Sequence, residues 1–370
     1  MCNSIYHVSS LEFYRHLVRN EIDDAADLKS AMSTASLFPD VHVASSCLQK
    51  ALRRADRVYA HGAAEMLRQC DEQRLWRRLV VCAFEDFGLV DLGLTACVTA
   101  VASSKNFRLT LGEARALHYL IDKLVASAKD RRLDDLYALG AAALGDPGLL
   151  RRIEAGALGS VAAPRVHRCA RLMTACERSV PHRSFRALSL SACEQALNAM
   201  ARHGLVDQGL FELCDKGAHL SKCLLPLLLP LAIEATESSG GRGEVVGQVL
   251  PAVPLIDGIP AYAIDGFTRR GRALLERLSR QEPRLVALLG AFASKDRLDI
   301  CHHMLFFAEG ERCNSLVCDL LSEALHSEAV VVGTRQFPDR ARDAVALMGE
   351  LLPLLHAMRA GSTLAAQPHD

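Results

Sequence analysis

Two stretches of the sequence carry residue types that can do chemistry, and the first is a pair of carboxylates. Glu85 and Asp86 are adjacent and stand near the end of an apolar run that begins at Leu75. Neighbouring carboxylates can act as general acid and base or bind a metal ion. One adjacent pair without a second motif does not define either site. We therefore favour an ion pair with basic side chains of a neighbouring helix.

The second stretch contains the residue types that zinc prefers. Cys301, His302 and His303 are followed by Cys313 and Cys318. This spacing fits neither the paired C-x-x-C scheme nor the Cys₂His₂ scheme. Cysteine catalysis requires a histidine and an orienting group to meet in space, which spacing alone does not establish. We therefore predict no metal, no cofactor, no catalytic residue and no enzymatic activity, and a metal-dependent enzyme remains the second alternative.

The elements that must position these residues are helices. Alanine and leucine dominate the 370-residue chain and aromatic residues make up only 5%, which favours helix over strand. Apolar residues recur at helical spacing through residues 42–130, for example at Leu48, Leu52, Ala55 and Tyr59. The sequence therefore predicts an all-α fold, a helical-hairpin bundle or short helical array, with a less regular segment near 237–265.

Changes in composition divide the chain into six predicted segments. Residues 237–243 are small and polar and form the clearest linker. The predicted segments are an N-terminal helical extension (1–41), a helical domain (42–130), a helical domain with a basic segment (131–236), a linker with an irregular segment (237–265), a C-terminal helical region (266–360) and a disordered tail (361–370).

The negative charges of the paired carboxylates require a positive partner from another part of the fold. Periodicity predicts one helix over residues 72–87, with Gly88 as its C-terminal cap. Carboxylates at Glu85 and Asp86 then lie at the negative end of the helix dipole, which costs about 0.3–1 kcal/mol each. We expect a cation of the preceding predicted helix to donate hydrogen bonds to one of them and pin the two helices together. The candidate donors are Lys50, Arg53 and Arg54.

These charged residues also follow an ordered pattern along the chain. A Gln-Lys-x-x-Arg segment precedes an Arg-Arg-Leu run that leads to Glu-Asp-x-Gly-x-x-Asp. The residues of this pattern are Gln49, Lys50, Arg53, Arg77, Arg78, Glu85, Asp86, Gly88 and Asp91. Through them, roughly residues 42–130 resemble the C-terminal helical (collar) region of the RarA/MgsA family of AAA+ ATPases, which are associated with stalled replication forks. Phe84 stands where that family usually has a small residue.

The resemblance implies an oligomerising helical collar without its motor. A nucleotide-binding P-loop requires a Gly-Lys dipeptide, and the sequence contains none. Only about 40 residues precede the match, too few for an ATPase domain. The resemblance thus implies a non-catalytic interaction or oligomerisation protein associated with DNA replication, recombination or repair. Its expected partners are further copies of itself, a replication or repair protein, or a separate ATPase subunit.

Arginine-rich segments suggest an alternative function, direct binding of DNA or RNA. The net formal charge of the chain is zero, so such binding would need a local patch. Residues 151–186 hold eight arginines against two glutamates, a net charge of +6. Clustered arginines can follow a phosphate backbone, although pairing with carboxylates is the simpler interpretation. The candidate residues are Arg151, Arg152, Arg165, Arg168, Arg171, Arg178, Arg183, Arg186, Arg269, Arg270 and Arg272.

Cysteine usage and hydropathy indicate the compartment. The 13 cysteines are scattered among apolar residues, unlike the disulfide framework of short secreted chains. The N-terminus lacks a signal-peptide pattern. The most apolar stretch, residues 224–233, is ten residues long, whereas a membrane-spanning helix needs about 20. We therefore expect a cytoplasmic protein without a membrane contact.

Overall fold

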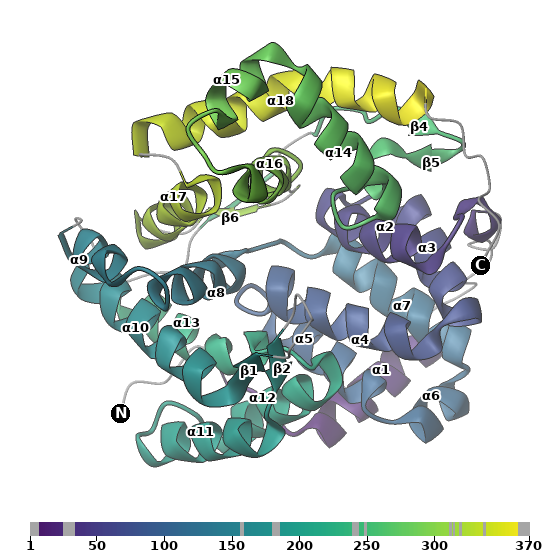
Figure 1. Ribbon diagram of the computed structural model, residues 1–370. Helices are drawn as coiled ribbons and strands as arrows, with labels where there is room; N and C mark the ends of the chain where they lie inside the picture. Colours follow the sequence, from purple (N-terminus) through teal and green to yellow (C-terminus); the bar gives the residue numbers. More distant parts are fainter. Residues whose placement is uncertain are drawn as a thin grey trace.

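The computed structural model describes residues 7–24, 34–155, 159–179, 186–238, 244–247, 250–310, 313, 315–317, 320–335 and 338–361. Helices dominate this part of the chain (Figure 1), which confirms the predicted all-α fold. Apart from Gly361, the predicted disordered tail lies outside the described residues, as do Arg183 and Cys318.

The helices of the first half follow one another with short connections. Their bounds are α1 (Leu11–Asp24), η2 (Ala35–Leu37), α2 (Val41–Arg54), α3 (Arg57–Cys70), α4 (Glu72–Cys82), η3 (Ala83–Phe87), α5 (Leu92–Ala102), α6 (Lys105–Leu111), α7 (Glu113–Ala126), α8 (Arg132–Ala143), α9 (Pro147–Ala155) and α10 (Gly159–Cys176).

The described part of the second half is also mainly helical and includes a short 3₁₀ turn. Its helices are α11 (Leu190–Arg202), α12 (Gln208–Ser221), α13 (Leu225–Ser238), η4 (Ala261–Ala263), α14 (Arg269–Gln281), α15 (Pro283–Leu289), α16 (Ser294–Ala308), α17 (Leu320–Thr334) and α18 (Pro338–Gly361).

Aspartate side chains fix where several helices begin. Asp40 accepts hydrogen bonds from the backbone N–H groups of His42 and Val43, and Asp56 caps α3 through Tyr59. These bonds satisfy N–H groups that lack a partner within the helix. The apolar stripe predicted to run through Ala55 is interrupted there, because Ala55 is left-handed at φ 53° and α3 starts anew after Asp56. Consequently α3 separates α2 from α4, and α2 is not the helix directly preceding the carboxylate pair.

Short strands pair two by two in the less regular parts. The antiparallel pairs are β1 (Glu177–Ser179) with β2 (Arg186–Leu188), β3 (Glu244–Val246) with β6 (Ser315–Val317), and β4 (Leu255–Ile256) with β5 (Ile259–Pro260). Asp257 and Gly258 connect β4 to β5, and both have positive φ, as a tight two-residue hairpin turn requires. Three of these strands lie within 244–260, so the segment near 237–265 is the less regular one that composition predicts.

Two hydrophobic cores hold the helices together. The larger core takes side chains from Val8 through Ile264 and adds Leu325 and Ala329 of α17. The smaller core is built by α14, α15, α16 and α18. The apolar stretch of α13 is buried in the larger core, with Leu227, Leu228 and Leu229 fully covered. None of the described helices combines the length and the apolar character needed to cross a membrane.

Candidate functional site

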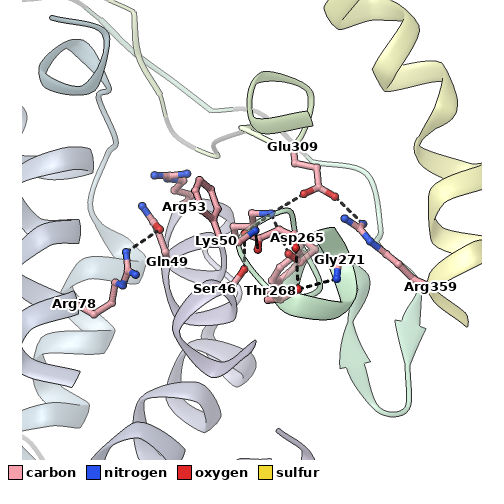
Figure 2. Close-up of polar contacts among 12 residues, drawn as sticks. Ser46, Gln49, Lys50, Arg53, Arg78, Asp265, Thr268, Gly271, Glu309 and Arg359 are labelled. Carbon is pink, nitrogen blue, oxygen red and sulfur yellow. Dashed lines mark hydrogen bonds and ion pairs between the residues drawn. The ribbon is translucent and has the colours of Figure 1, made fainter. Parts of the chain in front are cut away.

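One face of α2 carries a stripe of polar side chains that is buried between the two cores. Ser46, Gln49, Lys50 and Arg53 follow the spacing i, i+3, i+4, i+7, which places them on one side of the helix. Figure 2 shows these four side chains, with Arg78 beside Gln49 and with Asp265, Glu309 and Arg359 on the side of Ser46 and Lys50. We call the assembly the α2 charge network; its other members are Arg78, Glu85, Asp86, Arg131, Asp265, Glu309 and Arg359.

Arg53 forms the ion pair that the sequence predicts. Its Nη2 lies 2.5 Å from Glu85 Oε1 and its Nε lies 2.7 Å from Asp86 Oδ1. Gln49 donates to the second oxygen of Glu85 at 2.7 Å, and Arg131 Nη2 lies 3.5 Å from the first. Arg53 and both carboxylates are buried, so water screens their attraction only weakly.

The local backbone differs from the predicted single helix over 72–87. The α-helical part ends at Cys82, and residues 83–87 form the π-helical turn η3. Successive side chains of an α-helix diverge by about 100°, whereas the wider π turn brings Glu85 and Asp86 to the same guanidinium group. Single π turns of this kind occur often at functional sites. Gly88 is the C-terminal cap of the turn, with right-handed backbone angles.

Burial and neighbouring charges act in opposite directions on this pair. Burial raises the pKa of Glu85 to about 7, with a further contribution from Asp86, while Arg53 opposes the rise. For Arg53 itself, burial acts to lower the pKa, but Asp86 and Glu85 outweigh it and raise the value above normal. Asp86 Oδ2 is buried without a hydrogen-bond partner among the described residues. Burial thus shifts the protonation of Glu85 towards neutral pH.

Lys50, on the same face of α2, meets the C-terminal half of the chain. Its Nζ lies 2.6 Å from Glu309 Oε2 and 3.3 Å from Asp265 Oδ2, and it donates to the Tyr262 carbonyl at 3.0 Å. Arg359 of α18 binds the other oxygen of Glu309 at 2.7 Å. Burial acts to raise the pKa of Glu309, but Lys50 and Arg359 outweigh it and lower the value to about 2. Glu309 thus joins α2 of the larger core to α18 of the smaller one.

The loop before α14 is fixed by the same face of α2. Ser46 donates to Asp265 Oδ2 at 2.7 Å, and Asp265 Oδ1 accepts from the Phe267 N–H at 2.9 Å. Thr268 then caps α14 by accepting from the Gly271 N–H at 3.0 Å. A Cβ at Gly271 would lie 1.8 Å from the Asp265 carbonyl oxygen, so only glycine permits this approach.

The other residues of the collar-like pattern serve the surrounding packing. Arg78 approaches Gln49 Oε1 at 3.4 Å, and Arg77 donates to the Ser221 carbonyl of α12 at 2.9 Å. Asp91 caps α5 through the Leu94 N–H at 2.8 Å. Gln49 therefore links Arg78 to Glu85, and Arg53 links Glu85 to Asp86. Arg77, Gly88 and Asp91 lie at neighbouring helix contacts and ends.

Phe84 fits because a glycine faces it. A Cβ at Gly217 of α12 would lie 2.5 Å from two atoms of the Phe84 ring. The ring therefore occupies the space that a side chain on α12 would fill, and it is fully buried there. The bulk of the Phe84 ring is thus accommodated by the absence of a side chain at Gly217 of α12.

Carboxylates neutralise part of the arginine-rich segment. Arg165 is buried and its Nη2 lies 3.3 Å from Glu234 Oε1 of α13. Arg168 approaches the other oxygen of Glu234 at 2.7 Å, and Arg152 pairs with Asp146 at 3.1 Å. These three arginines correspond to the ion-paired interpretation of the segment.

The remaining arginines of the segment are placed differently. Arg151 of α9 and Arg171 of α10 are exposed, and no carboxylate of the described chain pairs with either. Arg178 and Arg186 lie on the paired strands β1 and β2, whereas Arg183 lies outside the described residues. Arg151 and Arg171 thus have the exposure and the unneutralised charge that a phosphate contact requires.

The three arginines at the start of α14 also differ in their surroundings. Arg270 lies 3.5 Å from Asp257 Oδ2 and donates to the Arg359 carbonyl. Arg269 and Arg272 are exposed, and neither forms an ion pair within the described part of the chain. The middle arginine therefore belongs to the packing between α14 and α18, and the outer two face solvent.

The cysteine–histidine stretch does not converge on one point. Cys301 is buried in the smaller core, and burial raises its pKa to about 12. His302 and His303 line a cavity, and Cys313 is buried beside the end of α2. The described residues contain no group of three or more His, Cys, Asp or Glu side chains placed to hold a metal ion. Cys318 lies outside them.

Sequence reasoning did not identify the distant half of the α2 charge network. Asp265, Glu309 and Arg359 lie in segments that composition alone marks only as irregular or helical. The i, i+3, i+4, i+7 spacing of the polar residues on α2 is the signal that was present. Because apolar residues occupy most of the rest of that helix, the spacing indicates a buried polar stripe, but it does not name the partners.

Comparison with known proteins gives no relative for this chain: no family model, curated protein or solved structure matches it. The resemblance to the RarA/MgsA collar therefore stays a prediction from the residue pattern. The geometry of the α2 charge network stands independently of it.

Proposed function

We propose that this chain is a non-catalytic α-helical protein that self-associates and binds protein partners in DNA replication, recombination or repair. The observation that supports this function best is the buried arrangement of Arg53 with Glu85 and Asp86. These charged groups are paired with one another, so they stabilise a helical scaffold and do not face a substrate. The link to replication comes from the resemblance to the collar region.

Exposed apolar side chains of the collar-like region supply contact points for association. Val58 of α3 is 60% exposed and Leu109 of α6 is 59% exposed. Protein interfaces bury apolar groups of this kind at their centres and leave polar groups at the rim. A charge placed at either position leaves the internal core untouched, because the side chain points mainly to solvent.

Sedimentation velocity over a range of protein concentrations tests self-association. The wild type should form a defined oligomer at both about 50 mM and about 200 mM salt, because apolar contacts do not depend on screening. Val58→Glu or Leu109→Glu should shift the population towards monomer. Val286→Glu, at an exposed apolar residue of α15 outside the collar-like region, is the matched control and should sediment like the wild type.

Affinity purification from the native host tests the partner class. Quantitative mass spectrometry should find replication or repair proteins enriched with the tagged chain over a tagged, unrelated helical protein. A chain that remains monomeric at every concentration and enriches no such protein would contradict the proposed function.

Direct nucleic-acid binding is the second candidate, and the exposure of Arg151 and Arg171 favours it. Fluorescence anisotropy with labelled single-stranded, duplex and forked DNA measures it. Binding through arginine–phosphate contacts should weaken steeply between about 50 mM and about 200 mM salt. Arg171→Glu should weaken it further, whereas Arg277→Glu, at an exposed arginine of α14, should not. Absence of binding at the lower salt would exclude this candidate.

A further inference from the structure

A large cavity lies between helices of the two cores, and it meets the α2 charge network at Arg131, which lies over the Phe306 ring of its wall. Its volume is about 1140 Å³, and its walls come from α8, α9, α16 and α17, with Phe267 in the loop before α14. Figure 1 shows α8 and α9 facing α16 and α17 across this region. Sites for small organic molecules typically measure about 300–1000 Å³, so the space suffices for such a ligand.

Aromatic rings form one wall of the cavity. Phe306 and Phe307 lie edge to face with ring centroids 5.5 Å apart, and the Phe267 ring lies 6.3 Å from that of His302. Phe267 is 78% exposed, an unusual state for a large apolar side chain that lines a cavity. Small apolar residues of α8 and α17 complete the lining. A flat or apolar ligand body would be covered by these groups and would in turn cover Phe267.

The charged residues of the lining favour a cation. Four carboxylates face two guanidinium groups, which leaves a formal charge of −2 while the histidines are neutral. These residues are Asp134, Asp135, Asp146, Asp299, Arg152 and Arg335. Asp146 and Asp299 are about half exposed, so a ligand can reach them. Arg152 pairs with Asp146, Arg335 with Asp299 and Arg131 with Asp134, so the excess negative charge lies at Asp135 and disfavours an anion.

Phe306 already binds a cation in this structure. The guanidinium carbon of Arg131 lies 4.3 Å from the centre of the Phe306 ring, within the range of a cation–π contact. The negative face of a phenylalanine ring attracts ammonium groups in the same way. Phe267 and Phe307 present further rings of this type in the cavity wall.

Two histidines supply further polar groups to the lining. His303 Nδ1 lies 2.9 Å from the Asp299 carbonyl oxygen. Because a carbonyl only accepts, Nδ1 of the neutral ring carries the proton and Nε2 keeps a lone pair. His302 Nε2 is buried without a hydrogen-bond partner in the part of the chain that is described. Burial lowers the pKa of His302, with a further contribution from Arg272, which keeps the ring neutral at pH 7.

We propose that this cavity binds an organic cation, an ammonium or amidinium group carried on an aromatic or apolar body. The body packs against Phe267, Phe306 and Phe307, and the charged group lies among the carboxylates and aromatic faces. This site does not depend on self-association or on nucleic-acid binding.

Calorimetric titration of the full chain with three matched probes tests the ligand class. Naphthylmethylammonium, naphthylmethanol and naphthoate share one apolar body and carry a positive, zero and negative charge. The ammonium probe should bind most tightly, by about tenfold or more over the carboxylate, and the alcohol should lie between them. No saturable binding by any probe, or tightest binding by the carboxylate, overturns the proposal.

Variants then locate the binding site. Phe267→Ala should weaken the ammonium probe by about tenfold and leave the fold intact, because this side chain is mostly exposed. Asp299→Asn should reduce the preference for the ammonium over the alcohol. Phe13→Ala, at a 52% exposed phenylalanine of α1 outside the cavity lining, is the control. Equal weakening by Phe13→Ala and Phe267→Ala would place the probe elsewhere and contradict the assignment.

Discussion

Replacing Asp86 by alanine isolates the contribution of the buried ion pair to stability. The change removes the carboxylate that binds Arg53 Nε at 2.7 Å and leaves the guanidinium group buried. Glu85 and the hydrogen bond of Gln49 to it remain in place. The variant therefore tests whether the paired carboxylates serve as structural counter-charges.

The size of the stability loss depends on the partners that Arg53 keeps in this variant. Breaking a buried ion pair so that one charge is left alone costs about 3–5 kcal/mol. Here Arg53 keeps Glu85, and the loss of Asp86 also removes a buried oxygen, Oδ2, that has no partner among the described residues. Both effects reduce the cost, so we expect Asp86→Ala to destabilise the fold by about 1–3 kcal/mol. Glu85→Ala should fall in the lower part of that range at pH 7, because a carboxyl with a pKa of about 7 is only partly charged there.

Urea unfolding monitored by tryptophan fluorescence measures this loss of stability, with a probe near the ion pair in sequence. Trp76 is the only tryptophan of the chain and lies buried in α4, one helical turn before Val80 and close to η3 in sequence. Its emission therefore reports unfolding of the larger core. Glu350→Ala breaks the exposed ion pair with Arg284 and should leave the unfolding midpoint unchanged, which makes it the matched control.

A double-mutant cycle provides the decisive comparison. Arg53→Met combined with Asp86→Ala should cost less than the two single changes added together, by about 0.5–3 kcal/mol, if the side chains interact directly. Unfolding midpoints of Asp86→Ala and Glu85→Ala that equal the wild-type value would refute a pinning role for the pair.

Three further predictions follow from the same packing. In the folded protein Glu85 has a pKa of about 7, against an ordinary value of 4.5, so its protonated form stabilises the fold at low pH. This contribution, up to about 3 kcal/mol, is lost as pH rises from 4.5 through 7. Glu85→Gln should flatten that part of a plot of stability against pH, and an unchanged slope would contradict the raised pKa of Glu85. The pKa of Glu309 is lowered to about 2, so its contribution to stability is present above pH 4.5 and is lost as pH falls towards 2. Glu309→Gln should lower the free energy of unfolding by about 3–5 kcal/mol at pH 7 and remove this acid sensitivity. Acid titrations of the wild type and the variant measure both effects. Gly217→Ala should destabilise the fold by about 1–3 kcal/mol, because the new Cβ meets the Phe84 ring. Gly349→Ala in α18 should stabilise it by about 0.5–1 kcal/mol, because the new Cβ lies in open space. Equal thermal midpoints for the two variants would disprove the close contact between Gly217 and Phe84.

The helical architecture and the local ion pair follow from sequence because both depend on short-range rules. Helical spacing of apolar residues predicts the all-α fold, and the cost of carboxylates at a helix end predicts a compensating cation, which is Arg53. The interruption at Ala55 was not predicted, because the apolar stripe continues through it and only the cap formed by Asp56 ends the periodicity. The π turn of η3 has no compositional signature at all.

Long-range partners could not be read from the sequence for a different reason. Asp265 lies 219 residues from Ser46, and Glu309 lies 259 residues from Lys50, so no spacing rule connects them. In the same way, the net charge of residues 151–186 does not reveal that Glu234 neutralises Arg165 and Arg168 from another helix. Charge counts give the composition of a segment, whereas tertiary packing decides which charges remain free.

The most direct test of the proposed function is sedimentation velocity of the wild-type chain mixed with labelled forked DNA at about 50 mM and about 200 mM salt, with protein and DNA detected separately. The proposed interaction protein should sediment as an oligomer at both salt concentrations, whether or not DNA is present. A chain that sediments as a monomer, and joins the forked DNA only at the lower salt, would contradict self-association and identify a nucleic-acid-binding protein.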